Sequence, residues 1–422
     1  MKQTKLQLIR KINVINKISK KMICLMLTVI MAAGCLITDT VMARAAAATF
    51  VYEGSDMIGQ GGYIYFIRNQ EDSSTATICR KRVSDGKVSK VATEQNGVIR
   101  LVVSGQYLYY TTSDDSGWLL YMCRLDGSDA RVLCTGMVCY ADAANVYGIE
   151  ELKNGKERLF CIAPETGEKQ KIKTVSARQT LSYIGNIGSD SYYYMADNQA
   201  DKVYLYRLGT TNKKQMIRVA TEKRSDKGSY SPLMISDVAQ SGGELYYDFG
   251  SYEGTGSFWY GTIRKLTTDG KKKTVAKSTG DDRLVIGSQA LYFSTPEGDN
   301  YKYQLSTEKK SKYSLALQKG IDYTILGDKT YMADTSNAKT VTISRFNSGT
   351  DRETLTKNFI TIPFKQKKKV SYSVTMKQIG IYNLVCVTGI DFTDQSYGWR
   401  GKLTSMNWYI TDGAGTVLGS FK

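Results

Sequence analysis

The sequence predicts an all-β protein made of a repeated unit, and three observations lead to this fold class. A tyrosine within a short apolar segment recurs in steps of 44, 38, 47, 52, 46 and 39 residues. The aligned tyrosines are Tyr65, Tyr109, Tyr147, Tyr194, Tyr246, Tyr292 and Tyr331. Each copy alternates apolar and polar residues between glycine-containing turns, which is typical of antiparallel strands. The chain has only 4 prolines and no long helical periodicity. A strand-rich repeat of about 40–50 residues predicts the blades of a β-propeller.

The second unit shows the pattern of one blade most clearly. Its four expected strands cover residues 98–103, 107–112, 118–125 and 130–134, and the last two are joined by a turn at Asp126-Gly127. Similar turns recur at Asp85-Gly86, Thr166-Gly167, Gly209-Thr210, Asp269-Gly270 and Ser348-Gly349. Such turns favour hairpins between neighbouring strands. A four-stranded sheet must bury its faces on its neighbours, so a closed ring of such sheets is expected.

The number of blades depends on how the C-terminal region is interpreted. Seven tyrosine units favour a seven-bladed propeller over residues 46–357, followed by a small all-β module over 358–422. This module would begin with a strand over 359–364, a basic turn at 365–369 and a strand over 370–376, and its final hairpin, residues 408–419, resembles that of small secreted β-sandwich modules. The alternative is an eight-bladed propeller, because residues 381–384 and 407–413 form an eighth candidate unit.

The second unit also resembles a known family. Leu108-Tyr109-Tyr110-Thr111, Arg124-Leu125-Asp126-Gly127-Ser128 and Arg131-Val132-Leu133 are similar to the YWTD-type blade of low-density-lipoprotein-receptor propellers and of bacterial secreted propellers of unknown function. The resemblance covers residues 50–357 and weakens outside the second unit: Gly148 follows the tyrosine of unit 3, and unit 6 lacks the Asp-Gly turn. It implies a propeller with a binding role, and it implies no particular ligand.

The first 45 residues predict a secretory leader. A basic segment from Lys2 to Lys21 precedes an apolar run over residues 22–37 and the small-residue site Ala43-Arg44-Ala45. This order is that of a signal peptide, with cleavage expected after Ala45. Lipidation at Cys35 and retention as an uncleaved anchor are the alternatives. We therefore expect a secreted protein, with association with the cell surface as the alternative. It would meet a membrane only through its leader, if that leader is lipidated or uncleaved.

The cysteine and histidine content of the chain limits the catalytic and metal-binding sites that it can form. Cys79, Cys123 and Cys161 fall at one repeat position that Tyr206 and Tyr303 occupy in other units, which indicates a packing role. Cys134 and Cys139 are close enough in sequence that a local disulfide remains open. The chain has no histidine, which excludes serine–histidine and cysteine–histidine catalysis. No metal site and no cofactor are expected, because paired Cys-x-x-Cys spacing is also absent.

Lysine-rich turns suggest a basic docking surface. Without its leader the chain keeps 57 − 8 = 49 basic and 40 − 1 = 39 acidic residues, a net charge of +10. The lysines at expected turns between third and fourth strands are Lys213, Lys214, Lys271, Lys272, Lys273, Lys309 and Lys310, with Lys312 nearby. They would lie on one face at the outer rim and attract an anionic partner. The alternative is that they discourage edge-to-edge aggregation of the sheets.

Two long loops near the fifth unit suggest a ligand-binding site. The connection over residues 222–232 and the loop over 249–257 are expected on the same face of the ring. They carry the candidate ligand-binding residues Arg224, Tyr230, Tyr252, Glu253 and Trp259. Long loops on a rigid scaffold are common binding sites, and aromatic rings pack well on sugars or peptides. The alternative for Trp259 is that it begins a strand, as Trp118 is expected to do.

These observations favour a non-catalytic binding propeller whose partner is a protein or an anionic cell-envelope polymer or glycan, and no nucleic acid is expected. The alternative is an envelope carbohydrate hydrolase or lyase that uses a carboxylate pair from Asp114, Asp115, Glu253 and Asp281. Hydrolysis would require two carboxyl groups about 5–10 Å apart.

Overall fold

The computed structural model describes residues 57–421 except for 70–74, 115–116, 198, 210–214, 225–231, 253–258, 281–283, 287–289, 298, 313–320, 327–328, 349–352, 380, 392 and 394–401. The expected leader lies outside these residues. Within them no helix is long and apolar enough to cross a membrane.

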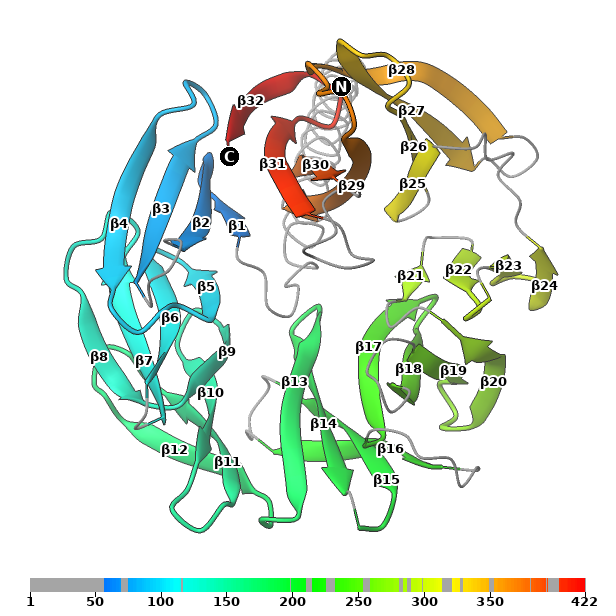
Figure 1. Ribbon diagram of the computed structural model, residues 1–422. Coiled ribbons are helices and arrows are strands. Elements are labelled where there is room, and N and C mark those ends of the chain that lie inside the picture. Colours follow the sequence, from blue (N-terminus) through cyan, green and yellow to red (C-terminus); the bar gives the residue numbers. More distant parts are fainter. Residues whose placement is uncertain are drawn as a thin grey trace, which may run out of the picture. The chain divides into compact units, whose positions relative to one another are not determined.

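The described chain forms eight four-stranded antiparallel sheets, each made of four consecutive strands (Figure 1). We number them as blades 1 to 8 in chain order. Blade 1 contains β1 (Met57–Gln60), β2 (Tyr63–Asn69), β3 (Ala76–Arg82) and β4 (Val88–Glu94). Blade 2 contains β5 (Arg100–Ser104), β6 (Tyr107–Asp114), β7 (Gly117–Arg124) and β8 (Arg131–Thr135). Blade 3 contains β9 (Met137–Ala141), β10 (Val146–Glu151), β11 (Glu157–Ile162) and β12 (Lys169–Thr174). Blade 4 contains β13 (Gln179–Ile187), β14 (Asp190–Asp197), β15 (Lys202–Leu208) and β16 (Met216–Lys223).

The second half of the chain continues the same order. Blade 5 contains β17 (Met234–Ser241), β18 (Glu244–Tyr252), β19 (Trp259–Leu266) and β20 (Lys272–Thr279). Blade 6 contains β21 (Val285–Ile286), β22 (Ala290–Ser294), β23 (Asn300–Gln304) and β24 (Lys309–Lys312). Blade 7 contains β25 (Ile321–Leu326), β26 (Lys329–Asp334), β27 (Thr340–Ser348) and β28 (Glu353–Pro363). Blade 8 contains β29 (Ser371–Ile379), β30 (Tyr382–Asp391), β31 (Lys402–Thr411) and β32 (Val417–Phe421).

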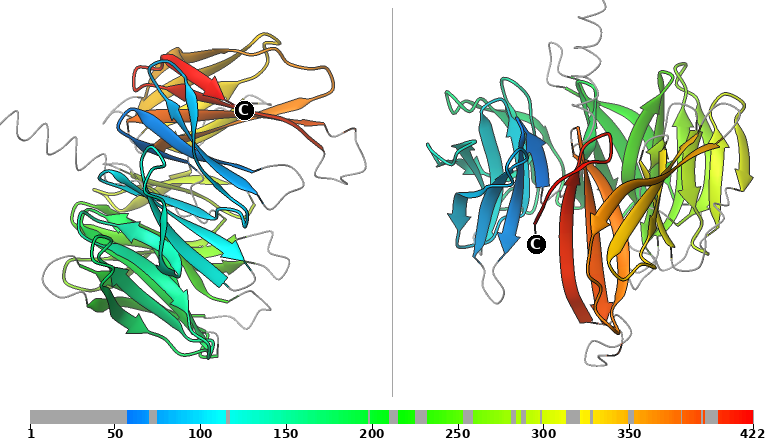
Figure 2. Two further views of the ribbon diagram at one scale, coloured as in Figure 1. Left: turned by 90° about the vertical axis from the view of Figure 1, so that its left-hand side faces the viewer. Right: turned by 90° about the horizontal axis from the view of Figure 1, so that it is seen from above.

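The blades stand around a common centre, with the first strand of each sheet innermost and the fourth outermost (Figure 1). Figure 2 shows that the strands run between the two faces of the ring. The protein is therefore an all-β propeller, as the sequence predicts. The count is eight, which was the alternative, and the preferred count of seven blades plus a separate module is corrected.

The correction rests on the strands around residue 358, where the module was expected to begin. Strand β28 runs through this position and pairs with β27 from Ser348↔Glu353 to Thr340↔Pro363, so it completes blade 7. The basic turn at residues 365–369 is the connection from blade 7 to blade 8. The final hairpin is the outer half of blade 8, because β31 pairs with both β30 and β32.

The aligned tyrosines all lie in second strands and pack between blades. Their side chains are at most 9% exposed. Apolar clusters of buried residues join neighbouring blades: one, for example, combines Val102 and Leu120 of blade 2 with Val138 and Phe160 of blade 3. The core of the protein is thus divided among the blade junctions, as expected for stacked sheets.

The cysteines behave as packing residues. Cys79, Cys123 and Cys161 lie on third strands and are at most 4% exposed, which confirms the prediction from their repeat position. No disulfide joins the cysteines of the described part of the chain. The disulfide considered between Cys134 and Cys139 is therefore not formed, because Cys134 lies on the outer strand of blade 2 and Cys139 on the inner strand of blade 3.

Candidate functional site

The strand order assigns every loop to one of two faces of the ring. Each sheet is an antiparallel meander, so the turns that join first to second and third to fourth strands emerge on one face, which we call the turn face. The loops that join second to third strands, and the connections between blades, emerge on the opposite face, which we call the loop face. The predicted ligand-binding residues belong to the loop face, and the predicted lysine turns belong to the turn face.

Arg224 ties two blades together at the loop face. It directly follows β16 of blade 4, and its Nε lies 3.0 Å from both carboxylate oxygens of Asp201 in the same blade. Its Nη1 donates a hydrogen bond of 2.9 Å to Ser251 Oγ in blade 5. Only 9% of the Arg224 side chain is exposed. Arg224 therefore fixes the base of the connection that begins at residue 225 against the end of β18.

The aromatic pair of the predicted site is formed, but one of its rings is buried. Tyr252 and Trp259 are paired across β18 and β19, and their ring centroids lie 5.2 Å apart with an interplanar angle of 65°. Trp259 is only 3% exposed, so it belongs to the interior of blade 5, whereas Tyr252 is partly exposed. Tyr230 and Glu253 lie outside the described residues, and nothing is concluded about their placement.

A buried carboxyl group next to this pair was not found from the sequence. Asp248 is fully buried, and its Oδ2 accepts hydrogen bonds from Trp259 Nε1 at 3.1 Å and Thr279 Oγ1 at 3.2 Å. Burial raises the pKa of Asp248 well above its usual range. The sequence feature that could have indicated this group is an acidic residue between the apolar residues Tyr247 and Phe249 of a strand. Because Asp248 has no exposed surface, we assign it a structural role in blade 5.

Gly261 is required beside this cluster for a steric reason. A Cβ atom at this position would collide with Thr279 Oγ1, Trp259 Nε1 and Asp248 Oδ1. The absence of a side chain therefore makes room for the three hydrogen-bonding groups.

The lysines of the turn at residues 269–273 are largely engaged in contacts within the protein. Lys271 Nζ lies 2.8 Å from the Asp269 carboxylate in its own turn. Lys272 Nζ donates to the carbonyl oxygen of Thr221 at 2.7 Å and lies 3.0 Å from Glu222, both in the neighbouring blade 4. The positive charges of these lysines are therefore partly compensated within the protein, and they are less available to a partner than the sequence suggested.

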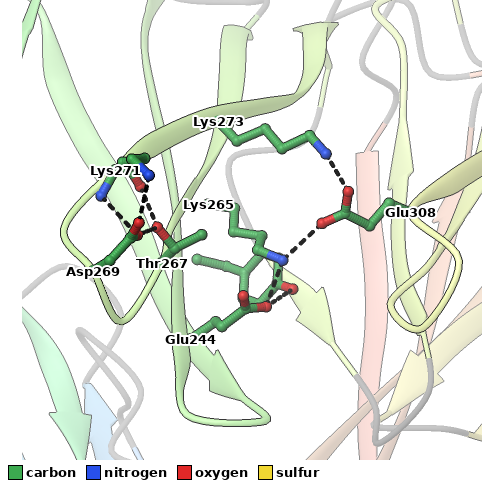
Figure 3. A network of polar contacts seen from close by, with 8 residues as sticks. Glu244, Lys265, Thr267, Asp269, Lys271, Lys273 and Glu308 are labelled. Atoms are coloured by element: carbon green, nitrogen blue, oxygen red, sulfur yellow. Dashed lines mark hydrogen bonds and ion pairs between the residues drawn. The ribbon is translucent and has the colours of Figure 1, made fainter.

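A second network joins blade 5 to blade 6 through Glu308 (Figure 3). The Glu308 carboxylate contacts Lys273 and lies 2.9 Å from Lys265 Nζ, while Lys265 also lies 2.6 Å from Glu244. The ammonium groups of Lys265 and Lys273 lower the pKa of Glu308 to about 2. Although burial opposes its charge, the pKa of Lys265 is raised by Glu244 and Glu308. This network crosses a blade junction and is part of the scaffold.

The remaining predicted lysines are only partly described. Lys213 and Lys214 lie outside the described residues. Lys309 and Lys310 are exposed on β24, the outer strand of blade 6, and Lys310 Nζ lies 4.5 Å from the centre of the Tyr301 ring. Lys312 pairs with Asp299 at 3.1 Å.

The described residues offer no metal site, since no group of three or more cysteine, aspartate or glutamate side chains is close enough to hold an ion. The carboxylate pair of the hydrolase alternative is not tested by the structure. Asp115, Glu253 and Asp281 lie outside the described residues, and the side chain of Asp114 is not described.

Comparisons with known proteins give no family assignment. No protein-family model and no curated protein sequence matches the chain. Among solved structures, one from a study of two prolyl endopeptidases is similar at 10% identity, with 83% of this chain and 56% of that chain covered and a TM-score of 0.49. Oligopeptidase B from Leishmania major is similar at 9% identity, with 86% and 56% covered and a TM-score of 0.48. BamB from Moraxella catarrhalis is similar at 12% identity, with 79% and 94% covered and a TM-score of 0.45. The chain thus spans only about half the length of the two peptidase structures.

Proposed function

We propose that this protein is an exported, non-catalytic binding propeller that holds a macromolecular partner on its loop face. The observation that supports this proposal most directly is the contact made by Arg224. Its nearly buried guanidinium group joins Asp201 and Ser251, and so it fixes the points where the two predicted binding loops leave blades 4 and 5. A loop whose base is already ordered loses less conformational entropy when it binds.

The position of Tyr252 adds to this argument. It lies at the end of β18, where the loop over residues 253–258 begins, and its ring packs on the buried Trp259. Tyrosine combines a large apolar surface with a hydroxyl group and is enriched in protein interfaces. Tyr252 is therefore placed to contact a partner from a rigid support.

Site-specific photocrosslinking tests the proposal. A photoreactive amino acid replaces Tyr252 on the loop face in one variant and Lys271 on the turn face in a control variant, and both are expressed in the natural host. We expect one defined crosslinked partner with the Tyr252 variant and none with the Lys271 variant. Equal crosslinking from both faces, or turnover of envelope polysaccharide by the purified protein, would contradict the proposal.

A further inference from the structure

The connection between blades 7 and 8 carries a second basic cluster, distinct from the lysine turns. We call residues 364–370 the lysine connection. Lys365, Lys367, Lys368 and Lys369 are all exposed within it, and Lys339 is exposed on the adjoining loop between β26 and β27. Both segments belong to the loop face, because one joins two blades and the other joins a second strand to a third.

Hydrogen bonds hold the lysine connection against the neighbouring loop. The Phe364 amide donates to the carbonyl oxygen of Lys339 at 2.8 Å, which brings the two basic segments together. The Gln366 amide donates to Ala338 O at 3.0 Å, and its side-chain Nε2 donates to Asn337 O at 3.0 Å.

The far end of the connection is fixed as well. The Lys367 amide donates to the Tyr372 hydroxyl at 2.9 Å, and the Tyr372 ring packs edge-on against Phe364 with 5.1 Å between centroids. The five lysines therefore project from an ordered backbone, and binding a partner would require little further ordering of the main chain.

The charge of this cluster is not balanced by carboxylates of the described residues. Lys271, Lys272 and Lys273 near the turn face all form ion pairs, and so does Lys312 at the loop-face end of β24. No ion pair joins any of the five lysines of the loop-face cluster to another described residue. Like charges held close together raise the electrostatic free energy, and a bound anion would lower it.

The kind of basic residue indicates the kind of anion. Lysine presents a compact point charge, whereas arginine makes the planar bidentate contacts that select individual carboxylate or phosphate groups. The five basic residues here are all lysines, set on two adjoining segments of backbone. Such a surface responds to charge density along a partner more than to the shape of one group.

We propose that the lysine connection, together with Lys339, binds a linear polyanion with repeated phosphate groups. This inference rests on the proposed binding function and specifies the chemistry of a partner on the loop face. Its failure would leave a partner at Tyr252 untouched, so the two proposals can be told apart.

Binding of long-chain inorganic polyphosphate to the full chain tests the inference. Wild type is compared with the triple variant Lys365→Gln/Lys367→Gln/Lys368→Gln, in which Lys369 is kept because its φ of 66° is unusual. We expect the triple variant to bind at least about tenfold more weakly at low salt. The slope of log affinity against log salt concentration should fall by about 2, as expected when three phosphate contacts to a flexible strand are lost.

The matched control removes the same number of charges from the outer rim of blade 6 through Lys309→Gln/Lys310→Gln/Lys312→Gln. Its affinity should stay within about twofold of wild type, and the thermal midpoint of each variant verifies folding. Equal losses in both triple variants would attribute binding to net charge and overturn the inference. So would an absence of polyphosphate binding by wild type, or tighter binding to phosphatidylglycerol vesicles through the same three lysines.

Discussion

Two glycines at corresponding turns show how single residues set the spacing of the blades. Gly127 and Gly415 lie in the turns between third and fourth strands of blades 2 and 8, with φ angles of 94° and 90°. A Cβ atom on Gly127 would collide with the carbonyl oxygen of Val91, and one on Gly415 with that of Phe359. Val91 and Phe359 lie on the outer strands of the preceding blades, so the same close approach occurs at both junctions.

The substitution Gly127→Ala should therefore destabilise the protein for two reasons. The left-handed backbone costs an alanine about 1–2 kcal/mol, and the collision with Val91 adds to this cost because a backbone carbonyl cannot turn away easily. Gly167→Ala is the control, since Gly167 has a similar φ of 72° but open space around it. Urea unfolding should show a larger loss for Gly127→Ala, and equal losses would contradict the steric argument.

The sequence predicted the turn at Asp126-Gly127 but not the close contact of Gly127 with Val91. Asp126-Gly127 was recognised as a hairpin turn, and the structure confirms it, with the Ser128 amide bonded to Asp126 Oδ1 at 2.9 Å. The approach to Val91 could not be predicted, because it depends on the distance between two neighbouring sheets. The hydrogen bonds of Asp248 could not be predicted either, because its partners lie on two other strands of its own sheet.

At the scale of strands and turns, ion pairs between blades explain why the lysine turns were misleading. Lys272 and Glu222 are 50 residues apart in sequence, and Lys273 and Glu308 are 35 residues apart. The structure places Lys272 and Lys273 at the start of β20, directly after the predicted turn. The sequence pattern does not show that a carboxylate from an adjacent blade lies beside each of them. No described carboxylate pairs with the lysines of the lysine connection. The two groups of lysines look alike in sequence and differ in their ion pairs.

The contact made by Glu308 predicts a specific dependence of stability on pH. Its pKa is about 2 in the folded protein, below the ordinary value of 4.5. A lowered pKa means that ionised Glu308 stabilises the fold above about pH 4.5 and that this contribution disappears as the pH falls toward 2. Glu308→Gln should therefore lower the thermal midpoint at pH 7 and leave it close to that of wild type near pH 2.

Glu168→Gln is the matched control for this prediction. Glu168 is exposed in the corresponding turn of blade 3, and no described basic side chain pairs with it. Its replacement should change the thermal midpoint little at either pH. A Glu308→Gln effect that persisted unchanged at pH 2 would show that the ion pairs with Lys265 and Lys273 do not cause it.

At the scale of the whole molecule, the sequence predicted the propeller but favoured one blade too few. The eighth candidate unit was set aside because residues 359–376 were interpreted as the start of a separate module, and its alignment was also obscured: in blade 8 Leu384 occupies the position that Tyr65 occupies in blade 1. Both are the third residue of a second strand and both are buried against the next blade. The position requires a large apolar side chain, and tyrosine is only its commonest occupant here.

Some of the basic side chains that give the protein its positive net charge also join neighbouring blades. The net charge alone does not show this. Arg80 donates to the carbonyl oxygen of Leu125 at 3.0 Å, and Lys169 donates to that of Thr135 at 3.4 Å. Lys272 makes the corresponding contact with Thr221. In each pair donor and acceptor belong to neighbouring blades, so part of the positive charge joins the sheets and is not available to a partner.

The junction between the first and last blades closes the ring by side-chain contacts. Each of the eight described sheets is built from consecutive strands, so chain connectivity does not hold blade 8 to blade 1. Their contact consists of an apolar cluster that includes Ile64, Phe66, Ile379 and Leu384, together with a hydrogen bond from Lys81 Nζ to the carbonyl oxygen of Ser420. Every described junction between consecutive blades also has a covalent connection.

Leu384→Ala should therefore open the ring at this junction before the rest unfolds. Removing a fully buried leucine costs about 2–5 kcal/mol. We expect hydrogen exchange, followed by mass spectrometry, to become faster in β1–β4 and β29–β32 while β9–β16 stay protected. Leu205→Ala removes an equally buried leucine between blades 4 and 5, which remain covalently joined, and it should accelerate exchange around β13–β20 instead. If Leu384→Ala accelerated exchange evenly in all eight blades, the ring would unfold as one cooperative unit, and closure between blades 8 and 1 would not be its weakest point.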